Sequence, residues 1–235
     1  MYRIIMMAVR LFLKTPYYLF LIWWYGKNPK KTYEDSYAIV KRTTKAANRA
    51  GKVKIESYGL ENIPKENGFI LFPNHQGLYD MLAILESCPV PFAFVIKKEA
   101  RNIILLKQVV EALGSIAIDR EDIRQSMQVI QQVTQEVKTG RNFLIFAEGT
   151  RSRQGNQLLN FKGGSFKSAV KAKCPIVPCV LIDAFKPFDE KSIKALTVKI
   201  IYLPPLYYEE YKDMKTVEIA AEVKCRIEKA MAQYI

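Results

Sequence analysis

Residues Gly68–Asp80 read GFILFPNHQGLYD, an apolar run that passes directly into a polar loop. The run Phe69–Phe72 predicts a β-strand, because it is short, apolar and bounded by glycine and proline. The loop that follows holds His75, the only histidine among 235 residues, and Asp80 comes five positions later. The stretch therefore predicts a strand that ends in a candidate chemical site.

Short apolar runs of this kind alternate with helical patterns from about residue 52 onward. The alternation predicts an α/β fold with a largely parallel central sheet of about seven strands, flanked by helices. The expected strands are Val53–Tyr58, Phe69–Phe72, Phe92–Ile96, Ser115–Ile118, Phe143–Phe146, Ile176–Ile182 and Val198–Leu203.

Helical patterns fill most of the intervals between these strands. The clearest helix is Ile123–Lys138, which ends before Gly140. Its apolar stripe consists of Ile123, Met127, Ile130, Val133 and Val137. The other expected helices are Thr32–Ala50 (with a capping-box spacing at its start), Tyr79–Glu86, Ile103–Leu113, Phe166–Ala172 and Thr216–Gln233.

The first 25 residues combine apolar, aromatic and basic side chains and contain no acidic residue. Their longest uncharged run, Thr15–Gly26, has 12 residues, whereas a spanning helix needs ~20. Tryptophan and tyrosine favour the headgroup region, and basic residues meet anionic lipid. Residues 1–31 are therefore predicted to be an interfacial helical docking segment ending in a linker, Gly26–Lys31, with the α/β domain at 32–235. An ordinary core helix and a single tilted span are the alternatives.

The chain carries 36 basic and 23 acidic side chains, a net charge of +13. Such an excess suits an anionic partner, which includes nucleic acid, an anionic bilayer, a phosphorylated substrate or an acidic protein. No RNA-binding aromatic block or zinc-finger spacing supports nucleic acid. The four cysteines form no C-x-x-C pair, so we expect no metal site and buried, reduced thiols.

The spacing of His75 and Asp80 fits a general base held by a carboxylate, which would orient the imidazole and stabilise its protonated form. Gly77 gives the loop the freedom to fold Asp80 back toward the ring. Asn74 can orient the loop through side-chain hydrogen bonds. On this spacing alone a structural histidine is an equally good interpretation.

A second polar motif, EGTRS at Glu148–Ser152, follows the predicted strand NFLIFA. A glycine, hydroxyls and the planar fork of Arg151 could cradle a phosphate beyond a strand end. A capped turn with solvated charges is the alternative. The chain contains no Walker loop and no G-x-S-x-G elbow. Asp119–Arg120, after the strand that ends at Ile118, is a weaker third motif.

Several blocks in order, NHQGLYD, Lys97-Lys98, GSIAIDR, FAEGTRS, FKGG and IVPCVL, resemble the 1-acylglycerol-3-phosphate acyltransferase family. That family is marked by H-x4-D and by F-x-E-G-T-R-S roughly 70 residues later. His75 to Asp80 and Phe146 to Ser152 match these motifs, and the resemblance covers residues 52–205. Ala147 departs from the family, in which proline is frequent. The N-terminus looks like the membrane-docking helices of bacterial members.

The resemblance implies transfer of a fatty acyl group from acyl-CoA or acyl carrier protein to the sn-2 hydroxyl of 1-acylglycerol 3-phosphate, giving phosphatidate. His75 would take the proton of the acceptor hydroxyl, and Asp80 would hold His75. No activated serine or cysteine is evident, so we expect direct transfer without an acyl-enzyme. Neither a cofactor nor a metal is implied.

The acceptor's phosphate needs cations, for which Arg151 is the first candidate, Lys97 the second and Arg120 the third. The expected acceptor pocket consists of Asn74, Glu148, Gly149, Thr150 and Ser152. Glu148 would bind a hydroxyl or hold Arg151. Pro178 either lines an acyl tunnel or is strand-edge structure.

The expected location is peripheral, on the cytoplasmic face of the cell membrane, where the basic surface would meet anionic lipid. Other acceptors remain open, namely glycerol 3-phosphate, another lysophospholipid or an aminolipid hydroxyl. Two rivals of other classes are a thioesterase that activates water and a non-catalytic, basic membrane-binding module.

Overall fold

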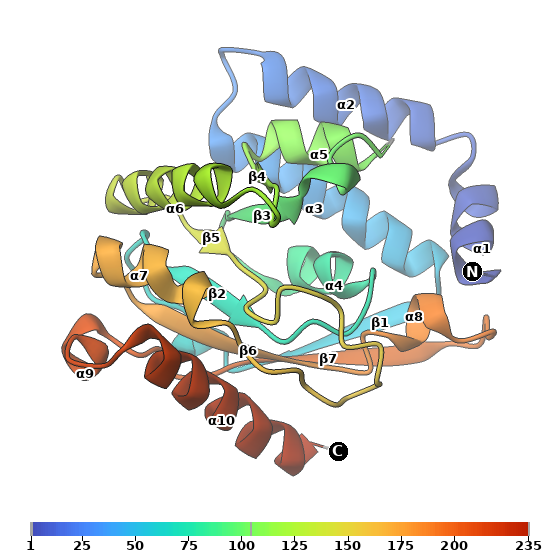
Figure 1. Ribbon diagram of the computed structural model, residues 1–235. Coiled ribbons are helices and arrows are strands. Elements are labelled where there is room, and N and C mark those ends of the chain that lie inside the picture. Colours follow the sequence, from blue (N-terminus) through green and yellow to red (C-terminus); the bar gives the residue numbers. More distant parts are fainter. Residues whose placement is uncertain (1, 104, 235) are drawn as a thin grey trace.

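The predicted apolar runs pair into one central sheet in the computed structural model, which describes residues 2–103 and 105–234 (Figure 1). Within these residues the sheet has seven strands in the order β1-β7-β6-β2-β5-β3-β4. Their bounds are β1 Val53–Tyr58, β2 Ile70–Pro73, β3 Ala93–Lys97, β4 Ile116–Ile118, β5 Phe143–Leu144, β6 Ile176–Ile182 and β7 Leu196–Tyr202.

The sheet is largely parallel, because only the β6–β7 pair is antiparallel. Strands β2 to β6 therefore run in one direction and β1 and β7 in the other. The predicted α/β class with a mostly parallel sheet is confirmed. In consequence the loops after β2, β3, β4, β5 and β6 all leave from the same edge of the sheet, where open α/β sheets place their sites.

Helices cover both faces of the sheet (Figure 1). On one face lie α3 (Tyr33–Ala50), α4 (Asp80–Ser87) and α5 (Leu106–Ala112), and on the other lie α6 (Ile123–Lys138), α7 (Lys167–Ala172) and α10 (Thr216–Tyr234). The remaining elements are α8 (Lys186–Asp189), α9 (Tyr208–Tyr211) and 3-10 turns at Leu60–Asn62, Lys98–Ala100 and Gly163–Phe166.

The β2 segment shows why this architecture buries so much apolar surface. Phe69 and Leu71 enter the core under α3 and α4, whereas Ile70 and Phe72 enter the core under α6 and α7. All four side chains are fully buried. Successive side chains of a strand point to opposite faces, so an unbroken apolar run is what a strand covered on both sides requires.

Most predicted elements are found, and β1, β6 and α6 have the predicted bounds. The capping box at the start of α3 is confirmed, since Thr32 Oγ1 accepts from Asp35 N (3.1 Å) and Asp35 Oδ2 accepts from Thr32 N (3.2 Å). The helix predicted over Ile103–Leu113 begins only at Leu106, and residue 104 of that prediction lies outside the described residues.

Three sequence predictions are wrong in detail. The strand predicted over Phe143–Phe146 ends at Leu144, because the chain then turns to form the EGTRS loop. The linker predicted over Gly26–Lys31 is shorter than expected, because helix α2 continues to Lys27. Gly26 is therefore a helical residue, and it lies where α2 packs closely against Ala112 of α5. Pro178 is not at a strand edge but inside β6, just before its ladder with β7 begins at Cys179.

The apolar stripe predicted for α6 is only partly buried. Ile123 is 80% exposed and Met127 41% exposed, whereas Val129, Val133 and Val137 form the buried face. The buried face of α6 is the one that contacts the sheet and α7. This face is rotated around the helix axis relative to the predicted stripe.

The N-terminus forms two helices, α1 (Tyr2–Leu11) and α2 (Thr15–Lys27), which lie outside the α3 and α5 layer (Figure 1). No single helix of the described residues is long and apolar enough to cross a membrane, although α1 and α2 together meet that test as a pair bent by 83°. Phe12 and Leu13, at the turn between them, are 74% and 88% exposed.

One buried arginine fastens α1 to the rest of the protein. The Arg3 guanidinium donates hydrogen bonds to the carbonyl oxygens of Gly51, Ser192 (3.1 Å) and Lys194 (2.8 Å). It thereby links α1 to the end of α3 and to the loop before β7. Arg10, on the same helix but exposed, donates to the Ala50 carbonyl at 2.9 Å.

We expect Arg3→Met to lower the free energy of unfolding by about 1–3 kcal/mol, because methionine replaces the aliphatic stem but leaves one buried and two partly buried carbonyls without a donor. Urea denaturation measures the loss. The matched control, Arg10→Met on the same helix, removes an exposed bond and should cost much less. Equal losses in the two variants would contradict the fastening role of Arg3.

Candidate active site

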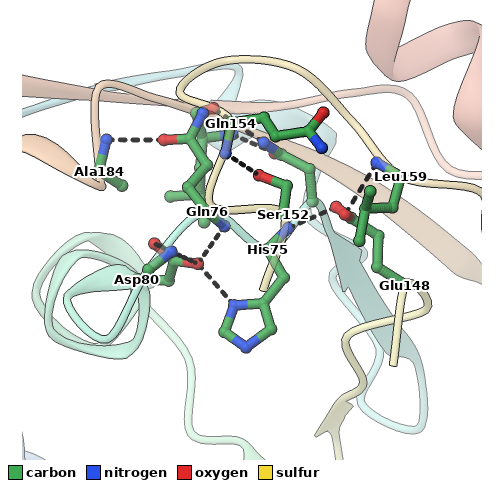
Figure 2. A network of polar contacts seen from close by, with 11 residues as sticks. His75, Gln76, Asp80, Glu148, Ser152, Gln154, Leu159 and Ala184 are labelled. Atoms are coloured by element: carbon green, nitrogen blue, oxygen red, sulfur yellow. Dashed lines mark hydrogen bonds and ion pairs between the residues drawn. The ribbon is translucent and has the colours of Figure 1, made fainter. Parts of the chain in front are cut away.

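His75 and Asp80 meet at the carboxyl end of β2. The His75 Nδ1 atom lies 2.7 Å from Asp80 Oδ2, and the Asp80 side chain is fully buried while that of His75 is 18% exposed. The loop folds Asp80, the first residue of α4, back toward the ring. The structure therefore places the two predicted site residues in direct hydrogen-bond contact (Figure 2).

The backbone of the loop completes the environment of the Asp80 carboxylate. Gln76 N donates to Oδ2 at 2.7 Å, and Gly77 N lies 3.1 Å from both carboxylate oxygens. Gly77 suits the tight packing of the loop against Phe185, whose Cα would be 3.3 Å from an added Cβ. Burial raises the pKa of Asp80, and the hydrogen bonds from His75 and from the two N–H groups oppose that rise.

This arrangement assigns different tasks to the two ring nitrogens of His75. Nδ1 faces the carboxylate and therefore carries the ring hydrogen, which it donates in a hydrogen bond to Asp80 Oδ2. Nε2 has no hydrogen-bond partner among the residues that the structure describes, and Figure 2 shows it pointing away from the polar network. Phe146 stacks on the ring with centroids 3.9 Å apart and an interplanar angle of 20°, which fixes the ring plane. The imidazole is thus presented as a base with a free lone pair.

Glu148 holds the backbone of His75. Its Oε1 accepts from His75 N at 2.7 Å and its Oε2 accepts from Leu159 N at 2.9 Å. Burial raises the pKa of this carboxyl, and the two backbone donors oppose the rise. The structure thus gives Glu148 a backbone-anchoring role that the sequence did not predict, and its expected contact with an acceptor hydroxyl stays a prediction.

The same loop holds the other side of His75, since Ser152 N donates to the His75 carbonyl at 2.8 Å. Asn74 is also a structural residue: its amide pairs with both backbone groups of Leu181, accepting from N at 2.7 Å and donating to O at 3.1 Å. Through these two bonds it joins the end of β2 to β6. The orientation of the loop by Asn74 is as the sequence predicts, but its place in the acceptor pocket is not supported.

The rest of the EGTRS motif lies in the turn beyond β5. Gly149 adopts a φ of +74°, and a Cβ there would come within 3.1 Å of the Lys162 side chain. Thr150 is exposed, and Ser152 is buried. Arg151 is half-buried and makes no hydrogen bond or ion pair to any described residue, so its guanidinium is available to an anion.

The two weaker phosphate candidates lie at the same edge of the sheet but outside the hydrogen-bonded network of His75. Lys97, at the end of β3, is exposed and pairs with Glu99 at 3.2 Å. Arg120 is exposed in the segment after β4. Asp119, beside it, is paired with Lys98. The structure does not bring Lys97 or Arg120 into contact with His75, Asp80 or Glu148.

Sequence patterns did not indicate three residues of the network, Gln76, Asn156 and Asp183. Gln76 is buried and binds Asn156, which binds Asp183. These residues lie in loops far apart in the chain, so no spacing relates them. Phe146 also went unassigned, although its place in the FAEGTRS block marks it as part of the site.

A cysteine nucleophile does not fit this site. Cys88, Cys174 and Cys179 are buried in the apolar core, as predicted, while Cys225 is half-buried. Burial raises the pKa of Cys88 to about 11 and that of Cys174 to about 12, so these thiols stay protonated near neutral pH.

Residues 54–182 match the Acyltransferase family. A 1-acyl-sn-glycerol-3-phosphate acyltransferase of Helicobacter pylori is 31% identical over 60% of this chain, and the match spans 63% of that relative, which is less than two thirds of its length. An enzyme of the same name from Salmonella typhimurium is 31% identical over 77% of this chain and 74% of its own length.

Among solved structures, the 1-acyl-sn-glycerophosphate (LPA) acyltransferase PlsC from Thermotoga maritima has the same fold. The TM-score is 0.73 and the identity 24%, over 97% of this chain and 98% of that chain. Together with the sequence matches, this likeness confirms the resemblance that the motifs indicate.

We expect Glu148→Gln to lower the free energy of unfolding by about 1–3 kcal/mol, because an amide offers one acceptor where two buried N–H groups need one each. Thermal or urea denaturation measures the change. Glu209→Gln is the matched control, since Glu209 is exposed and its carboxylate pairs with Lys212 and with no other residue that the structure describes. A loss no larger than in this control would contradict the role of Glu148 as a backbone anchor.

Proposed function

This chain belongs to the acyltransferase family, and we propose that it transfers a fatty acyl group from a thioester to the sn-2 hydroxyl of 1-acylglycerol 3-phosphate. The product would be phosphatidate, so the protein would act in phospholipid biosynthesis. The observation that carries the proposal is the His75–Asp80 pair, with Nδ1 held by a buried carboxylate at 2.7 Å and Nε2 free. The names of the relatives support the choice of acceptor.

In the proposed step His75 Nε2 takes the proton of the acceptor hydroxyl while that oxygen attacks the thioester carbonyl. Asp80 stabilises the imidazolium that forms. When the tetrahedral intermediate collapses, the carbon–sulfur bond breaks and the departing thiolate takes the proton back from His75. The acyl group thus passes directly to the acceptor, with no acyl-enzyme.

Arg151 is the proposed ligand of the acceptor's phosphate. Its guanidinium has no partner among the described residues and can form two parallel hydrogen bonds to phosphate oxygens. It lies between Glu148 and Ser152, which hold the N–H and the carbonyl of His75. One loop would therefore hold both the phosphate and the base, and Lys97 and Arg120 would add only longer-range attraction.

Acyl-CoA and acyl carrier protein both remain candidate donors, since each carries the acyl group as a thioester. Both are acidic, and the net charge of +13 favours the approach of either one. No cofactor or metal is part of the proposal.

We place the protein at the cytoplasmic face of the cell membrane as a peripheral protein. Exposed apolar and aromatic residues line α1, α2 and the turn between them, namely Tyr2, Ile5, Val9, Phe12, Leu13, Tyr17, Phe20 and Trp23. Arg10 and Lys14 are exposed in the same segment. This mixture suits insertion into the headgroup region of an anionic leaflet.

The function is tested with purified protein, labelled lysophosphatidate and both donors. We expect His75→Ala to lower kcat by about 10²–10⁴-fold, because a general base contributes that much. Arg151→Gln should raise the acceptor KM by roughly 10–100-fold and leave the donor KM nearly unchanged, since a charge-assisted bond is worth about 1.5–3 kcal/mol.

The matched control is Arg153→Gln, an exposed arginine two residues further on. If the His75→Ala variant keeps full activity, the proposed mechanism is refuted. Transfer to water without an acceptor would favour a thioesterase. A panel of glycerol 3-phosphate and other lysophospholipids decides the acceptor.

Membrane docking is tested with anionic vesicles and the double variant Phe12→Ser/Leu13→Ser. Because these side chains are exposed, their loss should spare the fold, yet it should weaken vesicle binding on the order of 100-fold. Val217→Ser is the control, because Val217 is 63% exposed at the start of α10, on the opposite side of the sheet from α2. Unchanged sedimentation of the double variant would refute docking through this turn.

A further inference from the structure

The residue after His75 is held by two loops at once. Gln76 is buried, its Nε2 donates to Asn156 Oδ1 at 2.7 Å, and its Oε1 accepts from Ala184 N at 2.8 Å. Asn156 belongs to the loop after β5 and Ala184 to the loop after β6. These loops flank the end of β2, because β2 lies between β5 and β6 in the sheet.

Asn156 uses both atoms of its amide in this connection. Its Oδ1 also accepts from Asp183 N at 2.9 Å, and its Nδ2 donates to Asp183 Oδ1 at 3.0 Å. Asp183 has a φ of +62°, and its second oxygen accepts from Lys186 Nζ at 2.8 Å. Both the backbone N–H and the side-chain carboxylate of Asp183 therefore form hydrogen bonds with the Asn156 amide.

The loop that contains Asn156 is the one that carries Arg151. Its base is closed by Lys162 N donating to the Ala147 carbonyl at 2.8 Å, and its first part is attached through Ser152 N to His75. Between residues 153 and 158, Asn156 is the residue whose side chain ties the loop to the histidine loop. Leu158 packs against the core under α6 and α7, so the Asn156 amide is the polar attachment of the outer half of the Arg151 loop.

We propose that Asn156 is a positioning residue for acyl transfer: by binding Gln76 and Asp183 it fixes the Arg151 loop relative to His75. This inference rests on the proposed function, in which Arg151 holds the phosphate and His75 the hydroxyl of one acceptor molecule. The reaction needs both groups at a set separation, and misplacement by about 1 Å can cost on the order of 100-fold in rate. Asn156 touches no reacting atom and acts through Arg151.

A double-mutant cycle tests this route. We expect Asn156→Ala to raise the acceptor KM about tenfold, the factor that about 1.4 kcal/mol represents. In an Arg151→Gln background the same substitution should cause no further rise, because the group it positions is gone. Asn160→Ala is the matched control, since Asn160 lies on the same loop but binds Lys224 of α10.

Exchanging the amide of Asn156 with the carboxylate of Asp183 tests whether the hydrogen bonds between these two side chains are what positions the loop. Asn156→Asp alone should be worse than Asn156→Ala, because it places a second carboxylate against Asp183. The double variant Asn156→Asp/Asp183→Asn should recover most of the wild-type KM. The carboxylate at 156 would accept from Gln76, from the backbone at 183 and from the new amide, whose oxygen still accepts from Lys186.

The outcomes separate the two proposals. A wild-type protein that acylates no lysophosphatidate refutes the proposed function. With an active wild type, additive KM effects of Asn156→Ala and Arg151→Gln overturn the positioning role. If Asn156→Ala is too unstable to assay, the exchange variant decides: a recovered KM supports the inference, and an unrecovered KM at wild-type melting temperature overturns it.

Discussion

The burial of β2 on both faces and along both edges is the constraint on which the rest of this structure depends. Its apolar side chains enter two separate cores, and its backbone pairs with β6 on one side and β5 on the other. The loop that follows such a strand leaves from its carboxyl end. There it is bordered by the loops that follow β5 and β6, the two neighbours of β2 in the sheet. The contacts of His75 with the loop after β5, and those of its neighbours Asn74 and Gln76 with β6 and the loop after it, follow from this placement.

Burial also explains the polar network at the end of β2. A buried carboxylate or amide is costly unless its polar atoms are hydrogen-bonded. Asp80, Glu148 and Asn74 meet this need with backbone groups, and Gln76 with a backbone group and an amide. Each hydrogen bond that satisfies a buried group also restricts the loop. The same bonds therefore fix the position of the imidazole.

Sequence reasoning reached the architecture because periodicity and strand-end chemistry are local properties. The alternation of apolar runs and helical stripes led to the α/β class, and the placement of NHQGLYD and EGTRS after two strands led to one site. The predictions failed where the surroundings of a side chain depend on elements that are distant in the sequence. Ile123 and Met127 belong to an apolar stripe but lie exposed, and the hydrogen bonds of Glu148 to the backbone of two loops were not predicted.

By itself the sequence determined the fold class, the strands whose ends carry the polar motifs, and the candidate for the base, because His75 is the only imidazole. Only the tertiary structure decided which side chains support that base. Hydrogen bonds act over about 3 Å, and the loops that carry Asn156 and Asp183 come within that distance of Gln76 only because β5 and β6 pair with β2. Strand order, which no local pattern encodes, therefore decides how the site is held.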